Sequence, residues 1–261
     1  MCYTGKNRLE RQADPVAIIF TSFSFLMLGA VSLLFWQASI IGYPGHIYLK
    51  VLCSFLFVAA GIVCLIYLFS KEKENLQPIE KKLAILTMVG LSFGLLGDLF
   101  LDVANIKGNA FFLLGLGCFV LTHIFYLVLL FSGYRLSFWD LIVFVLLFGG
   151  GILIGKFVLQ LQLGGMTVPC ILYAAVISAM LTRALSFLWA GSSSLPGAYS
   201  WVFLAGALLF FISDAILVVM MFGGQSAPWM EKVNAYTYFY GQLLVAFTPA
   251  LLTLSKMTPV Q

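Results

Sequence analysis

Two aspartates stand in stretches that otherwise have the composition of lipid-buried helices. Asp98 lies in LSFGLLGDLFLDV and Asp214 lies in GALLFFISDAILVV. An ionised carboxylate near the middle of a bilayer costs about 2.5–3.5 kcal/mol on insertion scales. Two carboxyl groups can divide acid and base chemistry between them when their surroundings differ. The pair therefore predicts a buried polar site, although either aspartate alone could serve as a structural hydrogen-bonding or ion-pair residue.

The composition indicates which elements carry these aspartates. The chain is 62% hydrophobic and 9% charged, whereas soluble domains carry about 25% charged residues. Polar breaks divide it into eight apolar spans of roughly 20 residues, enough to cross a core of ~30 Å. They cover 16–36, 47–69, 83–104, 110–132, 138–160, 168–190, 200–222 and 234–255. We expect an all-α polytopic membrane protein, with a polar tail at 1–15, one transmembrane domain at 16–255 and a C-terminal tail at 256–261.

The basic residues predict the orientation of the bundle. Nine of them fall at one end of the spans and only Lys107 and Lys232 lie in loops at the other. By the positive-inside rule, both termini are expected in the cytosol. The net charge of +4 follows from this topology, and no nucleic-acid partner is expected. The five cysteines form no CxxC pair, so neither a metal site nor a disulfide framework is predicted, and no cofactor is expected.

Residue counting estimates the depth of the polar side chains. At ~1.5 Å per residue, Asp98 lies about 8 Å and Asp214 about 10 Å below the non-cytosolic surface. Three other polar residues are expected in the same half of the membrane: Lys50, Asp102 and Gln242. His123 comes out at roughly 20 Å from that surface, and Tyr126 follows it on the next turn. This half of the bundle is therefore where a site would assemble.

Each neighbour also has a structural alternative. Lys50 could extend to the interface or pair with Asp98 or Asp102. His123 could form an ordinary interhelical hydrogen bond, and Asp102 could face water. Three further charged residues are expected at the interfaces, where Arg183 and Lys156 would extend towards water and Asp140 would lie beside aromatic residues.

Small residues indicate the direction in which Asp98 points. Gly90, Gly94 and Gly97 share one stripe of the third span with Asp98. Such a stripe lets another helix approach closely, so it predicts that Asp98 faces the bundle interior. A faint repeat also relates residues 97–101 to residues 213–217, each on the third helix of a four-helix half. We therefore expect a parallel four-plus-four duplication.

The order and spacing of these residues resemble those of the YhhN-like transmembrane lysoplasmalogenases. The resemblance rests on Gly97-Asp98, Phe112-x-x-Gly115, His123-x-x-Tyr126, Gly206 to Ser213-Asp214, and Tyr240-x-Gln242. Lys50 and Tyr173 also look like positions that the family uses. The likeness covers spans two to eight, whereas Asp102 has no clear counterpart and the tail before Pro15 is longer than in the shortest members.

The resemblance implies an integral membrane hydrolase that cleaves the vinyl ether bond of lysoplasmalogens. Its products would be a fatty aldehyde and glycerophosphoethanolamine or glycerophosphocholine, and Asp98 and Asp214 match the family's essential acidic positions. The reaction needs a proton donor, an anion near the developing cation and a base for water. We expect one aspartate to act as the acid and the other as base and stabiliser. Asp98 is favoured as the base because Lys50 could keep it ionised.

The remaining candidates would bind or orient the substrate. Gln242, Tyr240 and His123 would orient water or glycerol oxygens, with Tyr126 and Tyr173 beside them. Lys50 could contact the phosphate, although an ion pair with Asp98 or Asp102 is an equal alternative. Asn105 could meet the headgroup or simply end a helix. The expected partners are a lysophospholipid entering from the bilayer and the surrounding membrane lipids.

A proton-coupled transporter of a small or lipid-like solute is the main alternative, because intramembrane carboxylates and repeats are typical of such proteins. A lipid-binding scaffold is a third. Spans three and seven contain no internal proline break, which favours the hydrolase. The bacterial inner membrane and the eukaryotic endoplasmic reticulum both fit the composition, and no oligomeric state is predicted.

Overall fold

The computed structural model describes residues 15–38, 45–71, 76–190, 195–224 and 227–253. Within them every regular element is helical, which confirms the all-α fold. The predicted tails at 1–15 and 256–261 lie outside the described residues, apart from Pro15, which begins the first helix. Seven described helices are long and apolar enough to cross a membrane, so this is a multi-pass membrane protein.

The described residues form eight helical spans, as predicted. Seven are single helices, namely α1 (Pro15–Ala38), α2 (Gly45–Lys71), α3 (Pro78–Lys107), α4 (Asn109–Gly133), α7 (Thr167–Leu185), α8 (Gly197–Phe222) and α9 (Pro228–Leu251). The fifth span is continuous but composite, with α5 (Phe138–Phe144), the π-helical turn η1 (Val145–Gly149), α6 (Gly150–Leu153) and a second π-helical turn η2 (Ile154–Val158). Short 3₁₀ turns flank α7 as η3 (Gly164–Met166) and η4 (Ser186–Leu188).

The last helix, α9, falls below the hydropathy of a typical spanning segment, yet it is among the more buried helices. Its interior residues run from Tyr238 to Ala250 with few exceptions. Pro228 at its start supplies no backbone N–H, which the first turn does not need. Several side chains of α9 are polar and make hydrogen bonds inside the bundle, and these polar residues lower the hydropathy of the helix.

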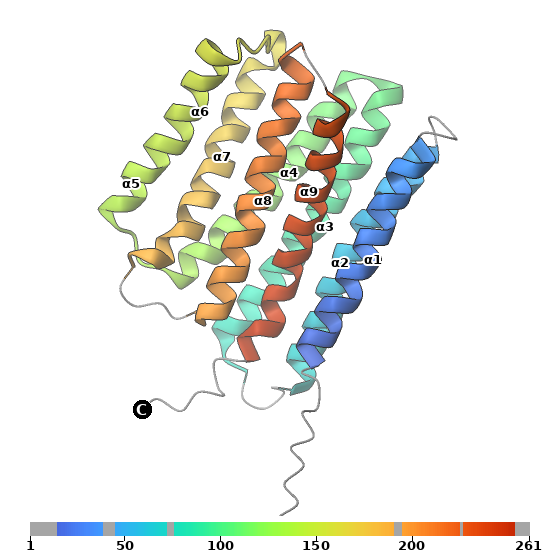
Figure 1. Cartoon of the computed structure of the whole chain (residues 1–261). Coiled ribbons are helices and arrows are strands. Elements are labelled where there is room, and N and C mark those ends of the chain that lie inside the picture. Colours follow the sequence, from blue (N-terminus) through green and yellow to red (C-terminus); the bar gives the residue numbers. More distant parts are fainter. Residues whose placement is uncertain (1–14, 39–44, 72–75, 191–194, 225–226, 254–261) are drawn as a thin grey trace, which may run out of the picture.

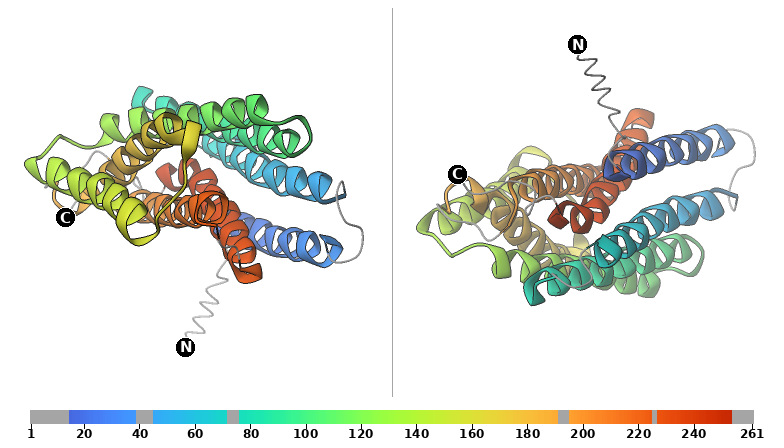
Figure 2. Two further views of the ribbon diagram at one scale, coloured as in Figure 1. Left: turned by 90° about the horizontal axis from the view of Figure 1, so that it is seen from above. Right: turned by 90° about the horizontal axis from the view of Figure 1, so that it is seen from below.

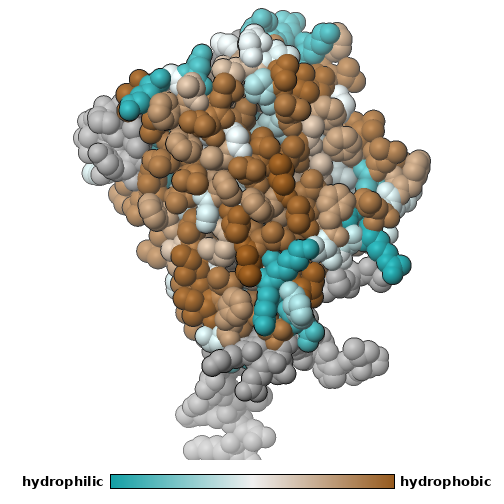
Figure 3. Space-filling model, turned by 180° about the vertical axis from the view of Figure 1, so that it is seen from behind, coloured by the Kyte–Doolittle hydropathy of each residue, from teal (hydrophilic) through white to brown (hydrophobic). Residues whose placement is uncertain are grey.

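The helices run alternately along one axis, so α1 begins and α9 ends at the same end of the bundle (Figure 1). The composite fifth span lies at one edge, outside α7 (Figure 2). On the face seen in Figure 3, hydrophobic residues cover most of the length of the bundle, and most of the hydrophilic residues lie towards its ends. The apolar sides agree with a bundle surrounded by lipid.

Glycines bring α8 and α9 into close contact. A Cβ on Gly206 would lie 2.8 Å from the carbonyl oxygen of Gly241, and one on Gly241 would lie 3.0 Å from the carbonyl oxygen of Gly206. Neither distance leaves room for a side chain. The two backbones therefore meet directly, as in other membrane helix pairs built on small residues.

Arg183 was predicted to extend to water and Asp140 to lie at the interface, but the two side chains form a buried ion pair. Both are buried, and Arg183 Nη1 donates to Asp140 Oδ2 at 2.6 Å. Ser186 and Trp189 donate to the other carboxylate oxygen, at 2.5 and 3.1 Å. Arg183 Nη2 also donates to the carbonyl of Tyr134 at 2.6 Å. The prediction failed because both residues lie near span ends, where depth alone does not show whether a partner is present.

This network fastens the start of the fifth span to the end of α7. We expect Arg183→Ala to lower the free energy of unfolding by about 3–5 kcal/mol, because it leaves the Asp140 carboxylate buried without its cation. Thermal unfolding in detergent would measure the loss. Arg135→Ala is the matched control, since that side chain is exposed. Replacing both partners, Arg183→Met with Asp140→Leu, should cost less than Arg183→Ala alone; an equal or larger cost would contradict the ion pair.

Candidate active site

Asp98 is enclosed by three helices. It is 2% exposed. Its Oδ2 accepts hydrogen bonds from Ser54 Oγ of α2 at 2.6 Å and from the Tyr238 hydroxyl of α9 at 2.7 Å. Ionised aspartate is an acceptor only, so two hydroxyl donors suit a carboxylate at this position.

The predicted glycine stripe of α3 faces the interior, as expected. A Cβ on Gly90 would meet the Tyr126 ring, and one on Gly94 would meet the Gln242 amide. Gly97 is covered in the same way by the Phe119 ring. These small residues let bulky side chains of α4 and α9 pack against α3, and the stripe turns Asp98 inward with them.

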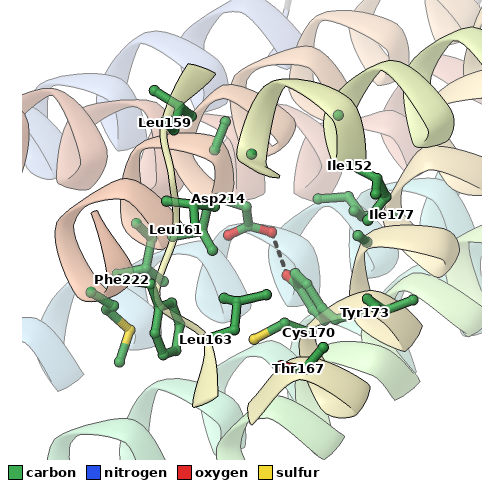
Figure 4. A pocket seen from close by; sticks show the side chains of 18 of the residues that line it. Ile152, Leu159, Leu161, Leu163, Thr167, Cys170, Tyr173, Ile177, Asp214 and Phe222 are labelled. Atoms are coloured by element: carbon green, nitrogen blue, oxygen red, sulfur yellow. Dashed lines mark hydrogen bonds between the residues drawn. The ribbon is translucent and has the colours of Figure 1, made fainter. Parts of the chain in front are cut away.

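Asp214 has a different set of partners. The Tyr173 hydroxyl of α7 donates to Asp214 Oδ2 (Figure 4). His123 Nε2 of α4 lies 3.1 Å from that hydroxyl oxygen and 3.9 Å from Asp214 Oδ2. Three helices thus meet at the second carboxyl group, as three meet at Asp98.

The direction of these bonds assigns the form of His123. Tyr173 has one hydroxyl hydrogen, which it donates to Asp214, so its oxygen must accept from His123 Nε2. The network therefore runs from His123 Nε2–H through Tyr173 to the carboxyl group. His123 is fully buried, and its Nδ1 finds no hydrogen-bond partner among the described residues.

A cavity of about 1000 Å³ opens beside Asp214. Its wall is formed by the fifth span, α7, α8 and parts of α3 and α4, and it is largely apolar. Asp214 and Tyr173 are among the lining residues, and the connecting segment with Leu159, Leu161 and Leu163 runs past them (Figure 4). Asp214 is correspondingly the more open carboxyl group, with 14% of its side chain exposed.

Asp98 lies behind this wall. Tyr238, which donates to Asp98, packs edge-on against Phe119 and Phe210, with ring centroids 5.9 and 5.2 Å apart. Phe210 in turn meets the His123 ring at 4.6 Å. A compact aromatic layer therefore separates the enclosed carboxyl group from the one that faces the cavity.

The structure resolves the alternatives for Lys50. Its Nζ lies 2.8 Å from Asp102 Oδ1, so Lys50 pairs with Asp102 and not with Asp98. Asp102 is buried, contrary to the alternative of a water-facing residue. Asn105 is exposed near the end of α3 and does not line the cavity. The expectation that Lys50 keeps Asp98 ionised is therefore not supported by a direct ion pair between them.

Three other candidates lie away from the cavity wall. Tyr126 donates to Gln242 Oε1 at 3.0 Å, in the interior between α4 and α9. Tyr240 donates to the carbonyl of Ser24 at 2.9 Å and so joins α9 to α1. Tyr126 and Gln242 thus support the packing around the glycine stripe, whereas Tyr240 contacts neither carboxyl group.

Ser54 and Tyr238 were missed from the sequence although both contact Asp98. Ser54 follows Lys50 by four residues, and Tyr238 precedes Gln242 by four. Residues four apart share one face of a helix. A search for hydroxyl side chains on the helix faces that carry Lys50 and Gln242 would therefore have found both residues.

A comparison with protein families places the chain. The family model described as the YhhN family matches residues 53–248, well over half of the 261 residues. The chain belongs to the YhhN family. The match runs from α2 to α9 and so includes both carboxyl groups of this YhhN protein together with Ser54, Tyr173 and Tyr238. Searches of the curated proteins and of the solved structures gave no match.

The Asp98 contacts give a prediction for stability. Tyr238→Phe removes one of two hydroxyl donors to a buried carboxylate and should lower the free energy of unfolding by about 1–3 kcal/mol. Thermal unfolding of the purified protein would measure it. Tyr236→Phe is the control, because the Tyr236 hydroxyl meets Ser32 in an exposed contact. The effect of Tyr238→Phe should shrink when Asp98 is already Asn, and an undiminished effect would show that the bond to Asp98 is not its cause.

Proposed function

We propose that this YhhN-family protein hydrolyses the vinyl ether bond of lysoplasmalogens, releasing a fatty aldehyde and glycerophosphoethanolamine or glycerophosphocholine. The observation that carries the proposal is the apolar cavity of about 1000 Å³ with Asp214 in its wall. Ligand pockets of ~300–1,000 Å³ that are mostly apolar with a few convergent polar groups are typical of small-molecule sites. An alkenyl chain would occupy the apolar part, which brings its polar end to the carboxyl group.

Asp214 is proposed as the proton donor because it faces the cavity. One carboxyl oxygen is held by Tyr173, and the other points away from that tyrosine (Figure 4). The acid proton passes to the β-carbon of the vinyl ether, which leaves an oxocarbenium ion. Water then adds to the α-carbon and returns a proton to Asp214. The resulting hemiacetal collapses to the aldehyde and the glycerol hydroxyl, so one carboxyl group serves as acid and then as base.

Asp98 is proposed as the stabilising anion. Its two hydroxyl donors suit a negative charge, and it lies behind the aromatic layer, outside the residues that line the cavity. A fixed charge in a region without water acts on the developing cation more strongly than it would in solution. His123 and Tyr173 hold Asp214 in position. The assignment keeps Asp98 ionised, as the sequence argument did, but it gives the role of base to Asp214 and not to Asp98.

Measurement of aldehyde release tests this proposal. The protein in detergent would receive a lysoplasmenylethanolamine, and wild type should release fatty aldehyde. Asp214→Asn should lower the rate by about 10²–10⁴-fold, the usual contribution of a general acid or base. Asp98→Asn should also lower it, while Glu231→Gln, an exposed carboxylate change at the start of α9, should not. Normal turnover of folded Asp214→Asn would exclude the mechanism.

The same preparation separates hydrolysis from transport. In proteoliposomes, the hydrolase should convert the lipid without accumulating it in the lumen. Uptake of unchanged lipid with no aldehyde would support a carrier instead.

We also propose an orientation, with both termini in the cytosol and the bundle in the bacterial inner membrane or the endoplasmic reticulum. Arg135 and the described basic residues next to the α2–α3 connection lie at the end of the bundle where α1 begins. Basic residues are typical of the cytosolic side of a membrane protein.

A further inference from the structure

The cavity carries one positive charge, and it is not the one that the sequence suggested. Among the described lining residues, Lys156 is the cation and Asp214 the acid. Lys50, the candidate for a phosphate contact, is absent from this lining and is paired with Asp102 at 2.8 Å. Lys156 was expected only to extend from a span end into water. Its place in the cavity wall puts it within reach of a bound ligand.

Lys156 is available to an anionic ligand. It is exposed, and within the described part of the chain its ammonium group forms no ion pair. Its described contact is with the face of the neighbouring Phe157 ring, at 5.3 Å from the ring centroid. A cation on an exposed aromatic face is held only weakly, and a charge-assisted bond to a phosphate is stronger.

The chain that follows Lys156 is firmly held. Leu159 and Leu161 donate backbone hydrogen bonds to Ile154 and Gly155, at 2.9 and 3.0 Å, and Gln162 donates to the carbonyl of Phe222 at 2.9 Å. The segment is thereby fastened both to the fifth span and to the end of α8. Lys156 is attached to a fixed turn, so its position relative to Asp214 on α8 is set by the fold.

Backbone strain adds a second sign of function in this turn. Gln160 has a φ of 49°, which non-glycine residues rarely adopt, and its carbonyl accepts a bond from the Gln162 amide at 3.1 Å. Such strain persists where the surroundings over-determine it, and it clusters at ligand sites. Gln160 and Gln162 both line the cavity, so amide groups stand close in sequence to the Lys156 ammonium.

The depth relation matches a lysophospholipid. Asp214 precedes Phe222, the last residue of α8, by eight positions, about 12 Å along the axis. The turn bonded to Phe222 is therefore nearer the membrane surface than the carboxyl group. In a lysophospholipid the phosphate likewise lies nearer the surface than the vinyl ether, separated from it by the glycerol.

We propose that Lys156 binds the phosphate group of the lysophospholipid and thereby sets the position of its vinyl ether beside Asp214. The proposal rests on the proposed function for the identity of the substrate. Within the described cavity wall no acidic side chain other than Asp214 is present to bind a cationic amine. Recognition should therefore depend on the phosphate and little on the amine attached to it.

Kinetics on the full-length protein test the proposal. Lys156→Ala should raise KM for lysoplasmenylethanolamine about tenfold or more, since bonds to charged groups are stronger than neutral ones, and should change kcat little. Lys156→Arg should restore most of the binding. Lys232→Ala, an exposed lysine outside the cavity lining, is the matched control. A 1-alkenylglycerol without phosphate should bind weakly to wild type and lose nothing further in Lys156→Ala.

A binding measurement distinguishes failure of this site from failure of the proposed hydrolysis. A 1-alkyl lysophospholipid has no vinyl ether, so its binding, measured by native mass spectrometry or thermal shift, does not depend on turnover. Tight binding that weakens in Lys156→Ala supports the phosphate site even if no aldehyde is ever released. Unchanged binding and KM in folded Lys156→Ala would overturn it, even if wild type hydrolyses the vinyl ether well.

Discussion

A buried carboxylate must be satisfied, and the bonds to Asp98 organise the centre of the bundle. Ser54 and Tyr238 bring α2 and α9 onto α3 at one point. The polar side chains that make α9 less apolar than the other spans also join neighbouring helices. For example, the Asn234 side-chain amide donates to the carbonyl oxygen of Ser213 in α8 at 2.7 Å. In lipid, helices gain little from burying apolar faces against one another. Directed bonds of this kind therefore specify which helices are neighbours.

The two carboxyl groups are held in corresponding ways. Each lies on the third helix of its four-helix half, α3 or α8. Each accepts a hydrogen bond from a hydroxyl group on the second helix of that half, Ser54 of α2 or Tyr173 of α7. Each is also approached from the fourth helix of the other half, α9 for Asp98 and α4 for Asp214. The correspondence agrees with the predicted duplication. The first span differs, because α1 packs on both α2 and α9, whereas the fifth span packs mainly on α7. The cavity therefore opens beside only one aspartate.

The sequence predicted the number of helices, the inward direction of the glycine stripe and the position of the two aspartates within spanning helices. Each of these depends on a pattern within one helix. It did not predict the partners. Depth counting placed Lys50 near both Asp98 and Asp102, and only the rotation of α2 against α3 decides between them. Arg183 and Asp140 were misplaced for the same reason, since a buried pair and two separate surface residues can have equal depths. The cavity could not be predicted from the sequence because it depends on how loosely the whole fifth span packs against its neighbours.

That loose packing has a cause in the fifth span itself. A helix in lipid must satisfy its backbone groups within the segment, and the π-helical turns at Val145–Gly149 and Ile154–Val158 do so with a changed helical repeat. An added Cβ on any of the glycines from Gly149 to Gly151 would meet nothing within 4 Å, so no other described helix packs against them. The Arg183–Asp140 pair fixes the start of the span to α7. The wall can thus stand away from α8 further along and keep its own hydrogen bonds, which leaves space beside Asp214.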